Sequence, residues 1–197
     1  MISPHSVVSP LWAVWLIVWL LAAPSAARTV ERQSTLSDLV HSTPIWGGAL
    51  LLFFHPPSLG VLLHPFAHVR EGIRWVGVGV AFVGLSLAGW ARMHLGRFWS
   101  GTVALKADHA LIRSGPYALA RHPIYAGLLL GLTGTAIADD TIAGMLGWCF
   151  LVLGVLLKAR QEEQLMIEHF GEVYRAYQRE VPAVIPRFRK RGRLRSP

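Results

Sequence analysis

The sequence predicts an all-α integral membrane protein with about five transmembrane helices, a C-terminal helix hairpin and a cytoplasmic amphipathic helix. Of its 197 residues, 53% are hydrophobic and 15% are charged, and the mean hydropathy is +0.43. Such an apolar composition is unusual for a soluble domain and typical of a membrane protein. This length fits a single membrane domain. We expect three N-terminal spans over 1–92, a functional core over 93–188 and a basic tail over 189–197.

Three apolar runs in the first half of the chain predict the first three spans. Residues 7–26 can span a bilayer, and no Lys or Arg precedes them, so the positively charged start of a signal peptide is missing. Residues 44–64 form a second run, which Pro56 and Pro57 should kink or break. Residues 74–92 form a third run, whose glycines would let a neighbouring helix approach closely.

A long polar connection over residues 93–122 leads to the predicted helix hairpin, and connections of this length are usually functional or disordered. Residues 123–138 and 141–158 are apolar and are parted only by the two aspartates of the sequence DDT over 139–141, which requires antiparallel helices. The first arm has about 16 residues, roughly 24 Å of helix, slightly short for a bilayer core of about 30 Å. Residues 161–179 then place apolar side chains at three- and four-residue spacing, which predicts an amphipathic helix.

Basic residues predict the orientation of these helices. The net charge is +8, and residues 186–197 contain six Lys or Arg and no acid. Beside membrane helices, anionic lipid headgroups are a simpler partner for this tail than nucleic acid, although a solvated tail that only fixes topology is the alternative. The tail and loop 93–122 hold most of the Lys and Arg, so the positive-inside rule makes their side cytoplasmic. Arg70 and Arg74 do not fit this orientation, because five spans place their loop on the non-cytoplasmic side of the membrane.

Ionisable residues gather at the predicted cytoplasmic ends of the last three spans. At membrane depth such residues are costly and usually functional. Carboxylates can hold an ammonium or sulfonium group and arginine can hold a carboxylate, so the set suits a small zwitterionic ligand. Topology anchors and interfacial tyrosines are the alternative explanation. The set comprises His109, Tyr117, Arg121, His122, Tyr125, Lys158, Arg160, Glu162 and Glu163.

Metal and disulfide chemistry have little support in the sequence. Cys149 is the single cysteine and lies in an apolar run. A lone buried thiol is usually a packing residue. The nine histidines are scattered, and no Cys/His cluster has metal-ligand spacing, so we expect no metal site.

Two segments carry a family resemblance. The sequence HALIRSGPYALARHPIYAG over 109–127, followed by EEQLMIEHFGEVYRAYQREVPAVIP over 162–186, resembles the isoprenylcysteine carboxyl methyltransferase family, part of a wider group with the phospholipid methyltransferases. The resemblance covers about residues 92–188. Each motif is weak alone, but the ordered set is specific: Arg-His-Pro-x-Tyr, a helix hairpin, Glu-Glu, Phe-Gly, Tyr-x-x-Tyr and Val-Pro.

The resemblance implies an integral membrane enzyme that uses S-adenosylmethionine. Glu162 matches the residue that holds the positively charged part of the cofactor. Lys158 matches a basic residue that faces the methyl acceptor, where eukaryotic members have arginine. Lysine lacks the forked contact with a carboxylate, so Arg160 is the alternative in that role. The implied cofactor residues are His109, Ala110, Leu111, Ile112, Tyr117, His122, Pro123, Ile124, Tyr125 and Glu162, and the implied catalytic residues are Lys158, Arg160, Glu163 and Arg121.

The expected reaction is direct methyl transfer to a lipophilic or amphiphilic acceptor that enters from the membrane. A prenylcysteine-type carboxylate is the first candidate acceptor, and a small thiol or a phospholipid amine is the alternative. A non-enzymatic membrane scaffold or transporter is a third possibility. We expect a multi-pass protein with its active site on the cytoplasmic side, with membrane lipids and no nucleic acid as partners.

Overall fold

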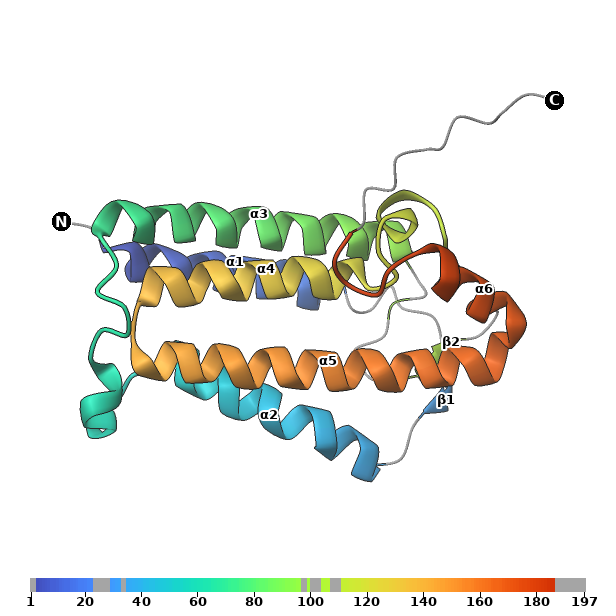
Figure 1. Ribbon diagram of the computed structural model, residues 1–197, viewed down its shortest axis with the longest axis horizontal. Helices are drawn as coiled ribbons and strands as arrows, with labels where there is room; N and C mark the ends of the chain where they lie inside the picture. Colours follow the sequence, from blue (N-terminus) through green and yellow to red (C-terminus); the bar gives the residue numbers. More distant parts are fainter. Residues whose placement is uncertain are drawn as a thin grey trace.

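Helices dominate the structure, a computed structural model that describes residues 3–22, 29–32, 35–96, 99, 104–106 and 111–186. Five long helices lie side by side in one bundle, and a short sixth helix covers one end (Figure 1). In chain order the elements are α1 (Pro4–Ala22), β1 (Thr29–Arg32), α2 (Thr35–Phe53), the 3-10 segment η2 (Pro57–Leu63), α3 (Glu71–Leu95), β2 (Ala104–Lys106), the 3-10 turn η4 (Gly115–Ala118), α4 (Pro123–Asp139), α5 (Ile142–Phe170) and α6 (Glu172–Glu180).

The prediction of an all-α integral membrane protein is confirmed. Among the described residues, α1, α3 and α5 are each long and apolar enough to cross a bilayer. α2 and η2 make a pair bent by 89°, which adds a fourth span if the pair crosses together. α4 is apolar but has only 17 residues. The number of five spans therefore stays a prediction.

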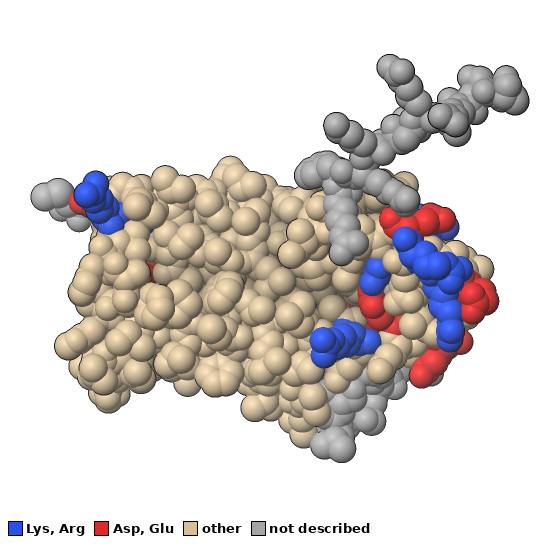
Figure 2. All heavy atoms as spheres, in the orientation of Figure 1, with Lys and Arg blue, Asp and Glu red and all other residues tan. Residues whose placement is uncertain are grey.

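The surface of the bundle is that of a protein in lipid. Large apolar side chains such as Leu21, Trp46 and Met93 are exposed on its sides. Figure 2 shows one face, whose broad middle is almost free of charge, while Lys, Arg, Asp and Glu gather at the two ends. A surface that is apolar in the middle and charged at its ends matches the layers of a membrane.

Glycine holds α3 and α4 in close contact, as the third apolar run predicted. A Cβ atom placed on Gly84 would lie 2.6 Å from the Gly127 carbonyl oxygen, so the two backbones touch where these glycines meet. α2 and α5 meet in the same way, because a Cβ on Gly48 would lie 2.6 Å from the Gly147 oxygen. Gly79 has nothing within 4 Å of its added Cβ, so only some of the α3 glycines serve this contact. Close approach through small residues is how helices associate without a hydrophobic driving force.

The hairpin forms as predicted and its turn is fixed by local chemistry. α4 begins at Pro123, where a missing N–H is harmless, and ends at Asp139. Asp140 follows with a positive φ of 55°. Thr141 then caps α5, since its hydroxyl oxygen accepts a hydrogen bond from the Gly144 N–H at 2.9 Å.

The prediction of one amphipathic helix over 161–179 is wrong. α5 continues without a break to Phe170, because the polar residues after its apolar part are good helix formers. Gly171 ends the helix with a φ of 55°, and its N–H donates to the Ile167 oxygen. The amphipathic element is the short α6, which buries Tyr174 and Tyr177 and leaves its charged residues exposed.

The connection over 93–122 is shorter than predicted at its start and partly structured. α3 runs on to Leu95. β2 pairs antiparallel with β1, with Thr29 opposite Lys106, which ties the segment after α1 to this connection. The basic tail over 189–197 lies outside the described residues.

Candidate active site

The hairpin brings the start of α4 and the far part of α5 to the same end of the bundle. Arg121 and His122 directly precede α4, while Glu162 and Glu163 lie on α5. The Arg121 Nε donates to Glu163 Oε1 at 2.8 Å, and an Nη of the same guanidinium lies 2.6 Å from that oxygen. Residues about 40 positions apart are thus in direct contact, which agrees with the predicted gathering of ionisable side chains at the ends of the last spans.

Arg121 also organises the end of the described chain. Its guanidinium donates to the backbone oxygens of Gln178, at 3.2 Å, and Val181. Its backbone N–H donates to the Pro182 oxygen at 2.9 Å, and the next N–H donates to Ala183 at 2.8 Å. The segment that follows α6 is therefore fastened to the start of α4.

His122 lies between the two glutamates. Its Nε2 is 3.2 Å from Glu163 Oε1, and its Nδ1 is 3.6 Å from Glu162 Oε2. The hydroxyl of Tyr125 donates to Glu162 Oε1 at 2.6 Å, and the Tyr125 ring stacks on the imidazole with centroids 5.5 Å apart. His122 and Tyr125 are buried, whereas the two carboxylates are partly exposed. The carboxylates of Glu162 and Glu163 are thus accessible to a ligand and lie beside the buried rings of His122 and Tyr125.

Tyr117 forms another side of this region. It is buried in η4, and its backbone oxygen accepts a hydrogen bond from the Tyr177 hydroxyl at 2.5 Å. Burial raises the pKa of Tyr117 well above its usual range, and the negative charge of Glu162 raises it further. The phenol therefore stays protonated at neutral pH and can donate a hydrogen bond.

An apolar wall adjoins the polar cluster. Ile124 and Tyr125 pack with Ala91, Val155 and Ala159, and half-buried aromatic side chains including Trp19 and Trp99 lie against them. A wall of this kind beside charged groups could receive the apolar part of an amphiphilic molecule.

Arg92 is a residue of this region that was not among the candidate site residues predicted from the sequence. It is buried at the end of α3 and donates to the Gly96 oxygen at 2.9 Å. Its guanidinium lies 4.4 Å from the centre of the Trp99 ring, a cation–π distance. An arginine inside an apolar run is the sequence signal that could have identified it.

Two α6 residues were also missed as members of the cluster. The side-chain amide of Gln178 donates to Glu163 Oε2 at 3.1 Å, and Tyr177 holds the backbone of Tyr117. The Tyr-x-x-Tyr motif was a signal for Tyr177, but no pattern identified the glutamine.

The remaining predicted residues lie less centrally or outside the description. Leu111 and Ile112 are half-buried ahead of η4, and Pro123 is buried at the start of α4. Lys158 is half-buried one helical turn before Glu162. Arg160 is exposed, and a two-residue offset turns it to another side of α5. His109 and Ala110 lie outside the described residues. The assigned roles of all these residues stay predictions.

The chemistry of the described cluster fits a cationic ligand. Glu162 offers a partly exposed carboxylate, and the phenol of Tyr125 lies directly beside it. Carboxylates and aromatic faces both attract sulfonium and ammonium groups. S-adenosylmethionine carries both groups, so the residues present suit it.

Comparison with known proteins agrees with the sequence resemblance. The model of the phospholipid methyltransferase family matches residues 73–173, a little over half of the chain, and so extends into α3. A cobalt-zinc-cadmium resistance protein, CzcN, of Cupriavidus metallidurans is 31% identical over 128 residues, which cover 62% of this chain and 56% of that protein. The protein-S-isoprenylcysteine O-methyltransferase of Schizosaccharomyces pombe is 33% identical over 113 residues, or 55% of this chain and 48% of that protein.

A shorter match links the chain to a third kind of relative. The methanethiol S-methyltransferase of Pseudomonas sp. (strain GM41(2012)) is 38% identical over 72 residues, which cover 36% of this chain and 26% of that protein. The chain thus spans about half the length, or less, of the curated relatives it matches. The matched range contains all of α4 and α5, the helices that carry Tyr125, Glu162 and Glu163. The chain belongs to the phospholipid methyltransferase family, the wider group that includes the isoprenylcysteine carboxyl methyltransferases.

Proposed function

We propose that the protein is a membrane methyltransferase that uses S-adenosylmethionine and methylates a lipophilic acceptor. The observation that carries this proposal is the partly exposed carboxylate of Glu162, held by Tyr125 beside the buried ring of His122. When bound, S-adenosylmethionine would supply an electrophilic methyl group on its sulfonium sulfur. The protein would mainly orient the two reactants and exclude water.

Each residue of the cluster has a task in this proposal. Glu162 holds positive charge of the cofactor, and Tyr125 fixes the direction of that carboxylate. His122 lies within reach of both carboxylates and so links the Glu162 position to Glu163. Arg121 is a positioning residue, because it acts by holding Glu163 and the segment after α6.

A prenylcysteine-type carboxylate is our first proposed acceptor. The apolar wall around Ile124 and Val155 would take the prenyl chain and leave the carboxylate at the polar end. A carboxylate is ionised at neutral pH and needs no base before it accepts a methyl group. Lys158, one turn before Glu162, is the cation that would attract it.

A small thiol is the second candidate acceptor, and one specific observation favours it. The imidazole of His122 lies 3.2 Å from Glu163, which is a pair suited to removing a thiol proton. The similarity to a methanethiol S-methyltransferase, over 72 residues, supports the same alternative. We also propose that the site faces the cytoplasm, since loop 93–122 and the chain after Lys158 hold most of the Lys and Arg of the sequence, and the positive-inside rule assigns such segments to the cytoplasmic side.

Binding of S-adenosylmethionine to the detergent-purified protein, measured by calorimetry, tests the proposal. We expect micromolar binding by the wild type and at least tenfold weaker binding by Glu162→Gln, because a hydrogen bond or contact to a charged group contributes about 1.5–3 kcal/mol. Glu168→Gln is the matched control, an exposed glutamate on the same helix. Equal affinity in the two variants would show that Glu162 does not hold the cofactor. Absence of binding by the folded wild type would refute the proposal that the protein uses S-adenosylmethionine.

The acceptor requires a separate assay. Transfer of a labelled methyl group to a farnesylated cysteine carboxylate, compared with transfer to a small thiol and to a phospholipid amine, distinguishes the candidates. Label in a base-labile ester would support the carboxylate, and label in a thioether would support the thiol.

A further inference from the structure

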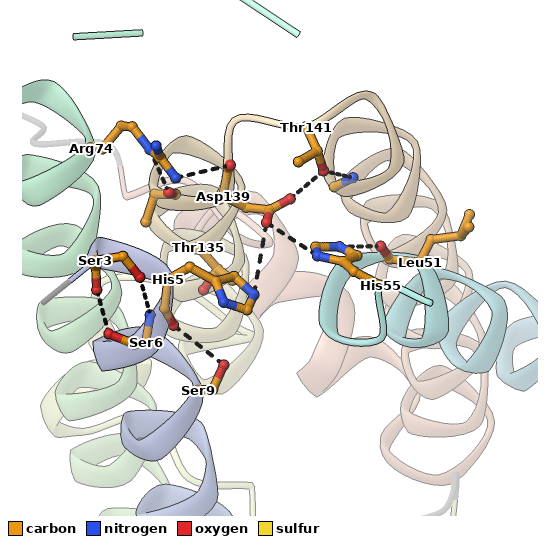
Figure 3. Close-up of polar contacts among 12 residues, drawn as sticks. Ser3, His5, Ser6, Ser9, Leu51, His55, Arg74, Thr135, Asp139 and Thr141 are labelled. Carbon is orange, nitrogen blue, oxygen red and sulfur yellow. Dashed lines mark hydrogen bonds and ion pairs between the residues drawn. The ribbon is translucent and has the colours of Figure 1, made fainter. Parts of the chain in front are cut away.

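A second polar cluster lies at the end of the bundle opposite Glu162 and Arg121. It consists of His5 in the first turn of α1, His55 just after α2, and Asp139 at the end of α4. α4 has 17 residues, so about 25 Å of helix separates this cluster from the candidate active site. Figure 3 shows the three side chains pointing toward one another from separate elements.

The distances within the cluster suit a bound cation better than hydrogen bonds. His5 Nε2 is 3.8 Å and His55 Nδ1 is 3.6 Å from Asp139 Oδ1, and the three atoms all lie within 4.8 Å of one another. Hydrogen bonds of this kind are about 2.7–3.2 Å long. A tetrahedral zinc ion with bonds of about 2.0–2.1 Å places its ligand atoms about 3.3 Å apart, which small side-chain rotations would reach from these positions.

Neighbouring groups orient the potential ligand atoms. His55 Nε2 lies 3.1 Å from the Leu51 backbone oxygen, which only accepts, so the proton belongs on Nε2. In the neutral ring this leaves the Nδ1 lone pair directed at Asp139. The hydroxyl of Thr141 donates to Asp139 Oδ2, which leaves Oδ1 for the cluster (Figure 3). Metal-binding histidines and carboxylates are typically held by outer partners of this kind.

The backbone beneath Asp139 is also fixed. The guanidinium of Arg74 donates to the backbone oxygens of Ala138, at 2.9 Å, and Asp139, at 3.3 Å. The next residue, Asp140, accepts from the N–H groups of Ala67 and Val69 at 3.0 and 2.8 Å. Both carboxylate oxygens of Asp140 therefore accept backbone hydrogen bonds, whereas the carboxylate of Asp139 points into the cluster.

The charge of Asp139 favours a cation in this position. Its side chain is only 3% exposed, and a buried carboxylate is costly unless positive charge or hydrogen bonds compensate it. A lone pair of His55 facing Oδ1 adds repulsion, which either a proton or a metal ion relieves. Nitrogen and oxygen ligands in this combination suit zinc and its first-row neighbours. The His5 side chain is 40% exposed, so water can complete the coordination.

We propose that His5, His55 and Asp139 bind a divalent transition-metal ion, such as Zn²⁺ or Co²⁺, at a site separate from the methyl-transfer region. The ion would fasten the start of α1 and the end of α2 to the α4–α5 turn. From sequence spacing we predicted no metal site, because the ligands come from three distant segments. The competing arrangement, protonated histidines paired with Asp139 and no metal, is the alternative that the test must distinguish.

Titration of the chelator-treated, detergent-purified protein with Zn²⁺ by calorimetry, and with Co²⁺ by visible absorption, tests this site. We expect one equivalent to bind to the wild type and binding at least tenfold weaker in His5→Ala and in His55→Ala. His64→Ala is the matched control, an exposed histidine at the same end, whose backbone oxygen accepts from the Ile142 N–H, and it should bind as the wild type does.

Circular dichroism of each variant establishes that it is folded before titration. Asp139 is the third proposed ligand, but Asp139→Asn would alter a buried group and could unfold the protein. The two histidine variants therefore decide the outcome. Absence of saturable binding by the wild type, or equal affinity in the wild type and both histidine variants, would overturn the proposal. None of these variants lies near Glu162, so failure here leaves the methyltransferase proposal intact.

Discussion

Replacement of Arg121 perturbs the largest set of polar contacts in the described cluster. The Arg121 side chain is 9% exposed and that of its partner Glu163 is 18% exposed, so the pair is largely removed from water. Loss of one partner from a buried ion pair costs about 3–5 kcal/mol. Because Glu163 stays partly hydrated and keeps contacts with His122 and Gln178, we expect Arg121→Ala to lower the free energy of unfolding by about 2–3 kcal/mol.

The conservative variant should give an intermediate result. Arg121→Lys retains the charge near Glu163 but cannot contact a carboxylate and two backbone oxygens at once, so we expect a loss of about 1–2 kcal/mol. In a chain of this size 1 kcal/mol lowers the melting temperature by about 2–4 °C. The melting temperature, measured by thermal unfolding in detergent, should therefore fall by about 4–12 °C for Arg121→Ala and by less for Arg121→Lys.

Arg113→Ala provides the control for this experiment. Arg113 also joins the connection to α6, through Glu180, but the two side chains are 39% and 63% exposed. An exposed ion pair contributes about 0–1 kcal/mol, so its loss should change the melting temperature little. If Arg121→Ala melted within 2 °C of Arg113→Ala, the reasoning that burial makes Arg121 the principal fastening of α6 would be refuted.

Two further predictions concern packing and the buried tyrosines. Gly84→Ala should lower the melting temperature in detergent, with an overpacking cost of about 1–3 kcal/mol where its Cβ meets the α4 backbone, whereas Gly79→Ala, with open space around it, should melt as the wild type does. Tyr177→Phe should cost about 1–2 kcal/mol, because the buried Tyr117 oxygen loses its donor. Burial raises the pKa of Tyr177 to about 12, so its stabilising contribution is present below the usual tyrosine pKa of about 10 and is lost as the pH rises toward 12. The melting temperature of Tyr177→Phe should therefore fall less steeply with alkaline pH than that of the wild type, in which Tyr117 adds a decline of its own.

The hairpin and its turn were predictable because they depend on local signals. Pro123 starts α4 and the DDT joint is too short for anything but an antiparallel return. These two facts were sufficient to place the residues near 121 beside those near 163. Pro56 and Pro57 likewise predicted the break after α2, which the bent pair confirms.

The parts that could not be predicted depend on long-range contacts or on one backbone angle. The apolar spacing over 161–179 suggested a separate amphipathic helix, yet residues 161–170 continue α5, since helix hydrogen bonds do not require an apolar environment. Gly171 was the missed signal for the true boundary. The fastening of Arg121 to Val181 and the meeting of His55 with Asp139 leave no periodic pattern in sequence, because each joins segments that only the fold brings together.

The order of synthesis gives the Arg121 contacts a further consequence. The Arg121 side chain can bind the Val181 oxygen only after Val181 has been synthesised, 60 residues later. The backbone N–H groups of residues 121 and 122 find their acceptors at Pro182 and Ala183, which are synthesised later still. All five long helices are complete before those partners exist. A nascent chain can therefore insert and pack its bundle while the polar end is still open, and the last few residues of the described chain close it. A stop codon just before Val181 should yield an inserted bundle whose polar end remains unfastened.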